Sequence, residues 1–293
     1  MRIRATVAAV SGALALSALA VPAAHAEDSA NLPHLPTSAA EIFDAAPQSA
    51  PKNARAAAAA MSGPVISKVV VNGGKSIVLG TTAAKKVSVS VTASHPSGVS
   101  DAFVALWHGK SLASEASLDG LVVPNEDEAK CAKANKTTST CKLTFTIKPG
   151  YDLYKNALAG TWKVWTAALA DNGVDVTEKQ TYSTVRVQRA SKLTVDAAPE
   201  PVKKGKTLTV KGKLSRANWE TFKYQGYTGQ PVKLQFRKKN SKTYTTIKTI
   251  KTNSTGNLKT TVKASASGYW RYSFAGTSTT PAINAAGDYV AVR

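Results

Sequence analysis

The chain has 293 residues and a formal net charge of +20 at pH 7, with 38 Lys and Arg against 18 Asp and Glu. It contains no GxSxG or HExxH motif, so it lacks the signatures of α/β-hydrolases and of helix-borne zinc proteases. Because a basic chain attracts polyanions in a salt-dependent way, the charge is the strongest chemical signal in the sequence.

The first 26 residues have the order of features found in a secretory signal peptide. Arg2 and Arg4 precede an apolar run, and Ala24-His25-Ala26 supplies an A-x-A cleavage site. The apolar run is too short for a stable membrane anchor. Because the two arginines are not adjacent and no cysteine follows the run, we expect the general export route without lipid attachment.

Residues 27–61 are rich in alanine and proline and poor in large apolar residues. A segment of this composition cannot bury enough surface to offset the entropy lost on ordering it. The run ARAAAAAM favours a short helix, but an isolated helix of that length is marginal. We therefore expect a disordered spacer.

From residue 62 to residue 190 the hydrophobic pattern alternates along the chain. Val87, Val89 and Val91 alternate with polar residues, and the same pattern returns in KLTFTIK (142–148) and STVRVQR (183–189). Turn signals such as NGGK, HPSG and DNG separate these segments. The pattern predicts about eight strands, no long helix, and a sandwich of antiparallel sheets.

Cys131 and Cys141 lie in this first unit, and they are the only cysteines of the chain. In an exported protein, an even number of cysteines is most simply paired. A metal-binding pair and a free reactive thiol are the alternatives, but no histidine lies nearby to complete a zinc site. We therefore predict a disulfide.

Residues 191–293 show the same alternation in about seven segments, the size of one immunoglobulin-like sandwich. In GYWRYSFAG (268–276), the rings of Trp270, Tyr272 and Phe274 fall on one face of the strand. Tyr269 and Arg271 fall on the other face. Because aromatic residues are favoured in strands, we interpret the first three rings as core rather than as a ligand platform. The predicted fold class is all-β, with two immunoglobulin-like β-sandwich domains in tandem, 62–190 and 191–293.

Two stretches resemble a known group of proteins. The run from Val232 to Thr277 contains a VxLxFR strand, a TxxxGxLxT hairpin and GxWRxxFxGT, and it resembles the repeat-type immunoglobulin-like domain of actinobacterial exported proteins. Residues 63–94 are similar to the first domain of uncharacterised two-domain secreted streptomycete proteins, some of whose relatives are loosely described as calcium-binding. The resemblance implies a fold and an extracellular compartment. It implies no reaction.

Candidate catalytic residues are few. His95 and His108 belong to the first unit, and Asp101 lies between them, so a His–Asp dyad is conceivable. Both histidines fall at predicted strand ends, where loop residues are the simpler interpretation. The second unit contains no histidine and only four acids. We therefore expect no enzymatic activity.

The best candidate for a metal site is the acidic run Glu126, Asp127 and Glu128 beside Cys131. Calcium takes about six to eight oxygen ligands from a curved loop, and no DxDxDG pattern accompanies these acids. The segment LADNGVD (169–175) is a second candidate, although Asp-Asn-Gly is first of all a turn signal. We expect no cofactor and no calcium requirement, with calcium binding kept as an alternative.

The charge is concentrated in the second unit. Residues 191–293 carry 19 Lys and Arg against four acids, whereas residues 62–190 carry 15 against 10. Strand alternation points many of these side chains outward, and the predicted polyanion-binding residues are Lys211, Lys213, Lys233, Arg237, Lys259, Lys263 and Arg271. The expected partners are anionic wall or extracellular polymers, with nucleic acid bound only non-specifically. The alternative is that the charge serves solubility and protects sheet edges.

A carbohydrate-binding surface is the remaining alternative. The segment RANWETFKYQGYTG (216–229) is a long loop whose aromatic residues simple alternation does not explain, and loops often carry function. Its candidate residues are Trp219, Tyr224 and Tyr227, although the loop would equally explain its rings by folding over and capping the sandwich. In the first unit, Trp165 falls on the opposite strand face from Trp162. Partial exposure of Trp165 and burial of both tryptophans in a central strand are the two alternatives.

The sequence thus predicts a secreted, non-enzymatic binding or structural protein, extracellular or associated with the cell wall. The run AAGDYVAVR at its end contains no second apolar segment, so no membrane span is expected. Calcium binding and carbohydrate binding stay open as alternatives. Nothing in the sequence predicts an oligomeric state.

Overall fold

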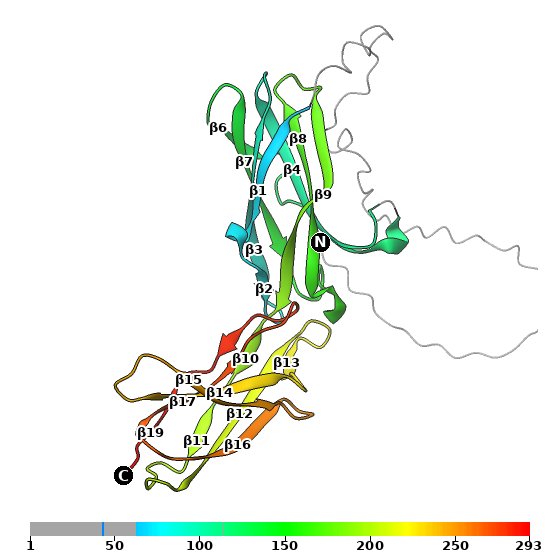
Figure 1. The fold of residues 1–293 in the computed structure, drawn as a ribbon. Coiled ribbons are helices and arrows are strands. Elements are labelled where there is room, and N and C mark those ends of the chain that lie inside the picture. The colour runs from blue at the N-terminus through cyan, green and yellow to red at the C-terminus, as the bar shows by residue number, and fades with distance from the viewer. Residues whose placement is uncertain (1–42, 44–62, 113) are drawn as a thin grey trace, which may run out of the picture. The chain divides into compact units, whose positions relative to one another are not determined.

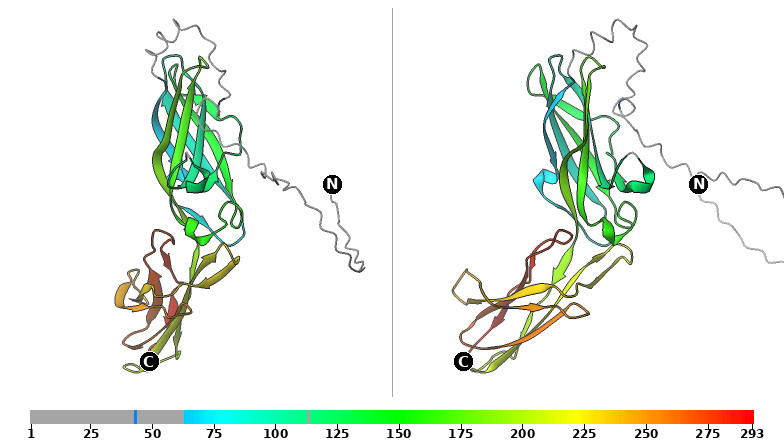
Figure 2. Two further views of the ribbon diagram at one scale, coloured as in Figure 1. Left: turned by 90° about the vertical axis from the view of Figure 1, so that its right-hand side faces the viewer. Right: turned by 45° about the vertical axis from the view of Figure 1, so that its right-hand side comes forward.

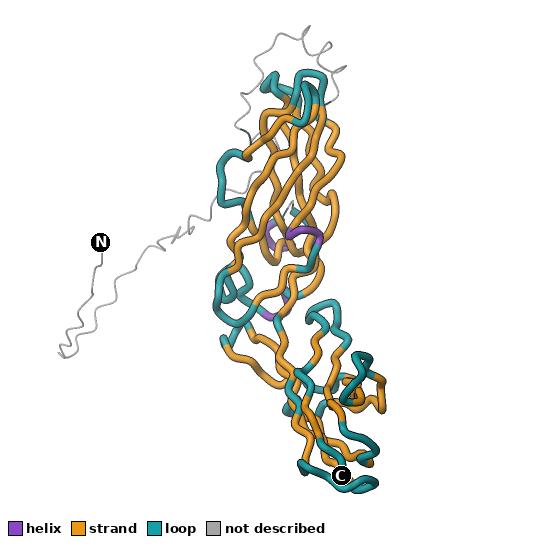
Figure 3. Tube along the Cα trace, turned by 90° about the vertical axis from the view of Figure 1, so that its left-hand side faces the viewer, coloured by secondary structure: helices purple, strands orange, loops and turns teal. Residues whose placement is uncertain are grey.

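The computed structural model describes residue 43, residues 63–112 and residues 114–293 (Figure 1). The predicted signal peptide and, apart from Phe43, the predicted spacer lie outside these residues. The described chain consists of strands and loops with only short helical turns (Figure 3), so the prediction of an all-β fold with immunoglobulin-like sandwiches is confirmed. Among the described residues, no helix is long and apolar enough to cross a membrane.

The first unit contains two sheets. One has the order β1-β3-β7-β6 and is antiparallel throughout; its strands are β1 (Val65–Val71), β3 (Lys85–Ser94), β7 (Thr138–Ile147) and β6 (Lys130–Lys133). The other has the order β2-β9-β8-β4-β5; its strands are β2 (Ile77–Leu79), β9 (Val176–Arg189), β8 (Gly160–Ala170), β4 (Val99–Gly109) and β5 (Leu118–Val122). The strands β2 and β9 pair in parallel. The short helical turns are η1 (Asn72–Gly74), η2 (Glu115–Ser117) and η3 (Asn156–Leu158).

The core of the first unit lies between these sheets. The alternating residues Val87, Val89 and Val91 of β3 are buried in it, together with Phe145 of β7 and Trp162 of β8. This is the burial that the alternation predicts, because successive side chains of a strand point to opposite faces.

Of the two alternatives for Trp165, the structure shows burial in a central strand, because β8 lies in the middle of its sheet. The ring of Trp165 is buried in a second, smaller cluster with Ala105 and Trp107. Leu118 and Leu121 of β5 pack against this cluster, and Leu112 precedes them in the β4–β5 connection. Trp165 Nε1 donates a hydrogen bond to Glu178 at 3.0 Å. The outer face of this sheet is therefore covered by the chain itself, which the alternation in one strand does not show.

The second unit also has two sheets (Figure 2). In one sheet, the long strand β12 (Thr207–Asn218) pairs with each of the other four strands. These are β10 (Ser191–Leu193), β11 (Asp196–Ala198), β13 (Lys223–Gly226) and β16 (Asn257–Lys263). In the other, β17 (Gly268–Phe274) pairs with β14 (Pro231–Lys238), β18 (Ile283–Asn284) and β19 (Asp288–Val290), and β15 (Thr245–Lys251) pairs with β14. The core between them includes Leu208 and Val210 from the first sheet and Leu234, Trp270 and Tyr272 from the second.

The β12–β13 hairpin carries Trp219 into the core of the first unit. Trp219 is fully buried there, and its Nε1 donates a hydrogen bond to the carbonyl of Gly80 at 3.0 Å. Asn156 Nδ2 donates to Asn218 Oδ1 at 2.9 Å beside it. These contacts tie the hairpin to the strands of residues 63–189.

Candidate functional site

The strand β17 separates core from surface by alternation. Trp270, Tyr272 and Phe274 are buried, whereas Tyr269 and Arg271 are half-buried on the outer face. Tyr272 Oη donates a hydrogen bond to the carbonyl of Val210 at 2.9 Å, and burial raises the pKa of its phenol. The interpretation of the three rings as core is confirmed, and the other two side chains are left for a surface.

That surface is a cluster of tyrosine rings and guanidinium groups. Arg237 of β14 lies opposite Tyr269 in register, with its Cζ 3.8 Å from the ring centroid. Tyr244, just before β15, has the Cζ of Arg271 at 3.7 Å and that of Arg237 at 5.3 Å from its ring centroid. The ring of Tyr289 in β19 lies 5.1 Å from that of Tyr269. We call these five residues the tyrosine–arginine face.

The two guanidinium groups have neutral partners. Arg271 Nε donates to Gln235 Oε1 at 2.8 Å, and Arg237 Nη1 donates to the carbonyl of Ser241 at 2.8 Å. Within residues 191–293, all of which the structure describes, neither group forms an ion pair. A guanidinium has several further N–H donors. The neutral partners therefore fix the position of each cation without compensating its charge.

The acids of the second unit lie elsewhere. Asp288 accepts a hydrogen bond from the backbone N–H of Ala197 at 2.7 Å. Glu200 is exposed, but partial desolvation raises its pKa, and the nearby Asp288 and Asp196 raise it further. Three of the four acids are therefore gathered in one region. Glu220 accepts a hydrogen bond from the backbone N–H of Asn156 at 3.2 Å. None of these four acids forms an ion pair with the guanidinium groups of the tyrosine–arginine face.

The seven predicted polyanion-binding residues do not form one face. Those on the sheet of β12 and β16 are exposed, and Lys211 pairs directly with Lys259; they are Lys211, Lys213, Lys259 and Lys263. Those on the sheet of β14 and β17 are Lys233, Arg237 and Arg271. Because the two sheets enclose the core, their outward side chains point in opposite directions. The seven residues predicted together as polyanion-binding therefore belong to two surfaces of the second unit.

The rings predicted to bind carbohydrate are not exposed. Trp219 and Tyr227 are buried, the latter with its ring edge-on to Phe274 at 5.7 Å. Tyr224 is half-buried, with the Lys192 ammonium 4.1 Å from its ring centroid. The alternative, a loop folded over onto a sandwich core, is what the structure shows for Trp219.

The exposed aromatic residue of this loop is Phe222. It is 48% exposed and has a φ of 58°, which is a strained conformation for a bulky side chain. Phe222 lines a cavity of 390 Å³ with Thr82, Lys148 and Tyr151, the last of which is 78% exposed. We call Phe222, Tyr151 and the neighbouring exposed Tyr154 the aromatic patch. Of these three residues, the sequence pointed only to Phe222, because it lies in the aromatic loop 216–229.

The disulfide between Cys131 and Cys141 is confirmed. The two residues lie directly opposite each other in the antiparallel pair β6–β7. The disulfide therefore holds the short edge strand β6 onto β7, where Cys141 is buried.

The acidic run beside the disulfide does not converge on one point. Glu126 accepts hydrogen bonds from the N–H and the hydroxyl of Thr144, both at 2.6 Å, and these hold the pKa of Glu126 below its ordinary value. Asp127 and Glu128 instead line a cavity of 400 Å³ together with Asp101 and Phe43. Among the described residues, no group of three or more His, Cys, Asp and Glu side chains is arranged to hold a metal. Calcium binding stays an untested alternative.

Asp101 is not the partner of either histidine. His95 Nδ1 lies 2.7 Å from Ser97 Oγ, and His95 Nε2 lies 3.4 Å from Asp175. His108 lies 3.3 Å from Asp119. The order Ser97–His95–Asp175 is that of a nucleophile, a base and an orienting acid. However, the backbone N–H of Ser97 donates to His95 Nδ1, and the backbone N–H of Gly98 donates to the carbonyl of His95. Because both N–H groups already have acceptors, neither N–H is free to stabilise an oxyanion.

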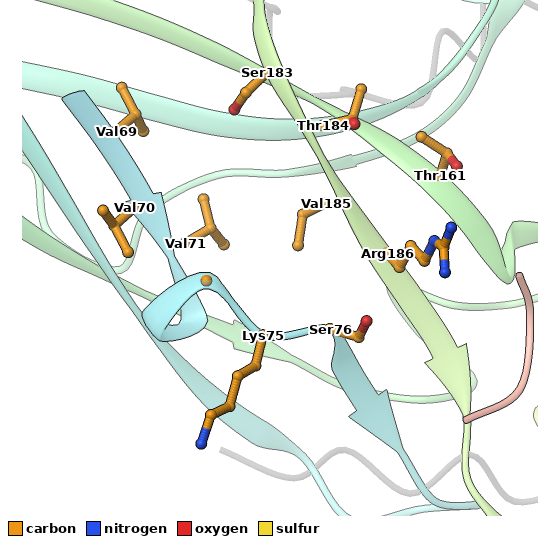
Figure 4. Close-up of a pocket in the computed structure, with 11 residues that line it drawn as sticks. Val69, Val70, Val71, Lys75, Ser76, Thr161, Ser183, Thr184, Val185 and Arg186 are labelled. Carbon is orange, nitrogen blue, oxygen red and sulfur yellow. The ribbon is translucent and has the colours of Figure 1, made fainter. Parts of the chain in front are cut away.

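A groove lies between β1 and β9 of the first unit (Figure 4). Its volume is 580 Å³. Val71 and Val185 lie between the two strands and are both buried. Hydroxyl residues and two cations complete the lining, namely Ser76, Thr161, Ser183, Thr184, Lys75 and Arg186. Sequence reasoning missed this groove, because its walls come from strands that are far apart in the chain.

Comparison with known proteins adds a family match for part of the chain. Residues 78–170, from β2 to β8, match the model of a family of unknown function, DUF5707. No curated protein matches the sequence.

Solved structures with similar folds include tandem β-domains. The fibronectin(III)-like modules of CbhA from Clostridium thermocellum are 11% identical, cover 77% of this chain and 93% of their own, and have a TM-score of 0.32. A chimeric titin Z1Z2-Z1Z2 tandem is 12% identical, with coverages of 78% and 99% and a TM-score of 0.27. The D00-D0 domain of intimin is 16% identical, with coverages of 76% and 99% and a TM-score of 0.25. Similarities this low carry no information about a ligand or a reaction.

Proposed function

We propose that this is a secreted, non-enzymatic binding protein whose second unit holds an anionic polymer on the tyrosine–arginine face. The observation that carries the proposal is the pair of guanidinium groups, Arg237 and Arg271, stacked on tyrosine rings with no carboxylate partner. A protein that needed these charges only for solubility would not have to hold them against aromatic rings.

The arrangement suits a phosphate or carboxylate group. Guanidinium donors form a planar fork that matches such anions in a bidentate manner. Contact with a tyrosine ring restrains the fork through the cation–π attraction, so less side-chain entropy is lost when an anion binds. Lys233, exposed on the same strand as Arg237, extends the positive surface along a repeating ligand.

The proposed polymer is an anionic glycopolymer of the envelope or the extracellular space. The disulfide favours an oxidising compartment, where such polymers are the abundant polyanions. The tyrosine rings provide apolar faces for sugar units between the anions. The absence of free oxyanion donors at Ser97 and Gly98 supports a binding role rather than a hydrolytic one.

The test compares two pairs of cations on opposite sheets. In the full chain, Arg237→Ala with Arg271→Ala removes the two guanidinium groups, and Lys259→Ala with Lys263→Ala removes the same charge from the other sheet. Binding to polyglycerol phosphate is measured at low and high salt. We expect the arginine pair to lose about tenfold or more in affinity and the lysine pair about threefold or less.

Three outcomes would count against the proposal. An equal loss in both pairs means that only net charge matters, and affinity that does not fall at high salt removes the electrostatic argument. Tighter binding to single-stranded DNA than to polyglycerol phosphate would identify nucleic acid as the ligand instead.

The aromatic patch supports a second candidate function, contact with neutral glycans. Its rings are exposed although Phe222 is held in a strained conformation, and such strain is concentrated at ligand sites. Retention on neutral polysaccharide in affinity electrophoresis should fall in Tyr151→Ala and Phe222→Ala and persist in the Arg237→Ala and Arg271→Ala pair. Retention that is unchanged in the two aromatic variants would exclude the patch.

A further inference from the structure

The groove between β1 and β9 exists because the chain changes sheets there. β1 pairs with β3 in one sheet, and the turn Asn72–Gly74 then carries the chain to the other sheet, where β2 pairs with β9 at Ile77 and Val187. All three turn residues have positive φ, and Asn72 Nδ2 donates to the carbonyls of Lys75 and Ser76 at 3.1 and 2.9 Å. The crossing is therefore built into the local sequence.

Among the described residues, the crossing leaves two strand edges without a partner. There β1 is an edge strand, paired with β3 alone. β9 pairs with β8 at Val176–Lys179 and Ser183–Val187 but with β2 only at Val187–Arg189. Its outer edge at residues 183–186 therefore has no pairing strand within the described chain. Such edges present backbone N–H and C=O groups to any added strand. Figure 4 shows β1 and β9 on the two sides of the opening, with Val71 and Val185 between them.

The size and lining of the groove suit an extended peptide. Its 580 Å³ falls within the range of about 300–1,000 Å³ found for ligand pockets. Val71 and Val185 provide an apolar floor, which takes every second side chain of an added strand. Ser183 and Thr184 are small enough to leave the backbone of β9 accessible.

The charges of the groove define the peptide further. Lys75 and Arg186 line it and are both exposed, and its lining by described residues includes no carboxylate. A second copy of this chain fits poorly, because its β1 edge would bring Lys68 and Lys75 against the same cations.

We propose that this groove binds an extended acidic peptide of a partner protein by β-strand addition to β1 or β9. Main-chain hydrogen bonds supply affinity in this mode, and alternate side chains supply specificity. The site belongs to the first unit and does not depend on the polymer-binding face of the second.

The experiment uses the full chain and two fluorescein-labelled peptides, EVTVEVTE and its lysine counterpart KVTVKVTK. Fluorescence anisotropy should show binding of the glutamate peptide alone. Lys75→Glu with Arg186→Glu should weaken it about tenfold or more. The matched pair Lys110→Glu with Lys136→Glu, two exposed lysines outside the groove lining, should bind as the unchanged protein does.

Hydrogen exchange is a second measurement, and it distinguishes strand addition from charge attraction alone, which would not protect backbone amides. Strand addition should slow amide exchange in residues 65–71 or 183–186 when the glutamate peptide is present. Binding without such protection, or equal losses in both variant pairs, would overturn the proposal. Protection of the same residues by raising the protein concentration without peptide would identify a second copy as the occupant and would also overturn it.

Discussion

Trp270 and Arg271 are neighbours in the chain, and their replacement should have very different effects on stability. Trp270 is 4% exposed, and its ring lies 4.6 Å from that of Phe236. A buried aromatic side chain removes about 150–250 Å² from water, which at about 25 cal/mol per Å² corresponds to about 4–6 kcal/mol. Because an alanine side chain still buries part of this area, Trp270→Ala should lower the free energy of unfolding by about 3–5 kcal/mol.

Arg271→Ala removes one hydrogen bond to Gln235 and one stacking contact with Tyr244 on the outer face. These losses amount to about 1–2 kcal/mol at most. A domain of this size is stabilised by only about 5–15 kcal/mol. Trp270→Ala should therefore bring the second unit close to unfolding, whereas Arg271→Ala should leave this unit folded.

Hydrogen exchange of the full chain separates the two units in one measurement. In Trp270→Ala, amides of β12, β14 and β16 should lose protection, while those of β3 and β8 should keep it. In Arg271→Ala, protection should be retained in both units. If Trp270→Ala kept its protection but lost polymer binding, the ring would be a ligand platform and the argument from alternation would be wrong. Equal destabilisation by the two variants would refute it as well.

Three further predictions concern the disulfide, calcium and pH. Cys131→Ser with Cys141→Ser should lower the free energy of unfolding by about 2–3 kcal/mol in the chain-entropy model, and mass spectrometry of the native protein should find no free thiol. The melting temperature should not rise with millimolar calcium relative to magnesium, and a calcium-specific rise of several degrees would point to Glu126–Glu128. Because partial desolvation and then Asp288 and Asp196 raise the pKa of Glu200 above its ordinary 4.5, its ionised form disfavours folding as pH rises through the folded-state pKa. Glu200→Gln should therefore raise the melting temperature at pH 7 but not well below pH 4.5, and an equal change at both would contradict the assignment.

The alternation of residues determined much of this protein without a structure. It separated Trp270, Tyr272 and Phe274 from Tyr269 and Arg271, and it identified the strands around Val87–Val91 and Leu143–Ile147. The pairing of Cys131 with Cys141 followed from composition and the expected compartment. These features are local or compositional, because whether a side chain points inward depends on its own strand.

Only the tertiary structure decided which strands became neighbours. It placed Tyr244 beside Arg237 and Arg271, and Tyr289 beside Tyr269. It also divided the predicted lysines between two opposed sheets. It also buried Trp219, whose predicted role as a sugar platform is lost, and left Phe222 exposed instead. Alternation fixes the face of a residue but carries no information about the sheet to which that face belongs. That depends on pairing between segments distant in sequence, and so do the tyrosine–arginine face and the groove between β1 and β9.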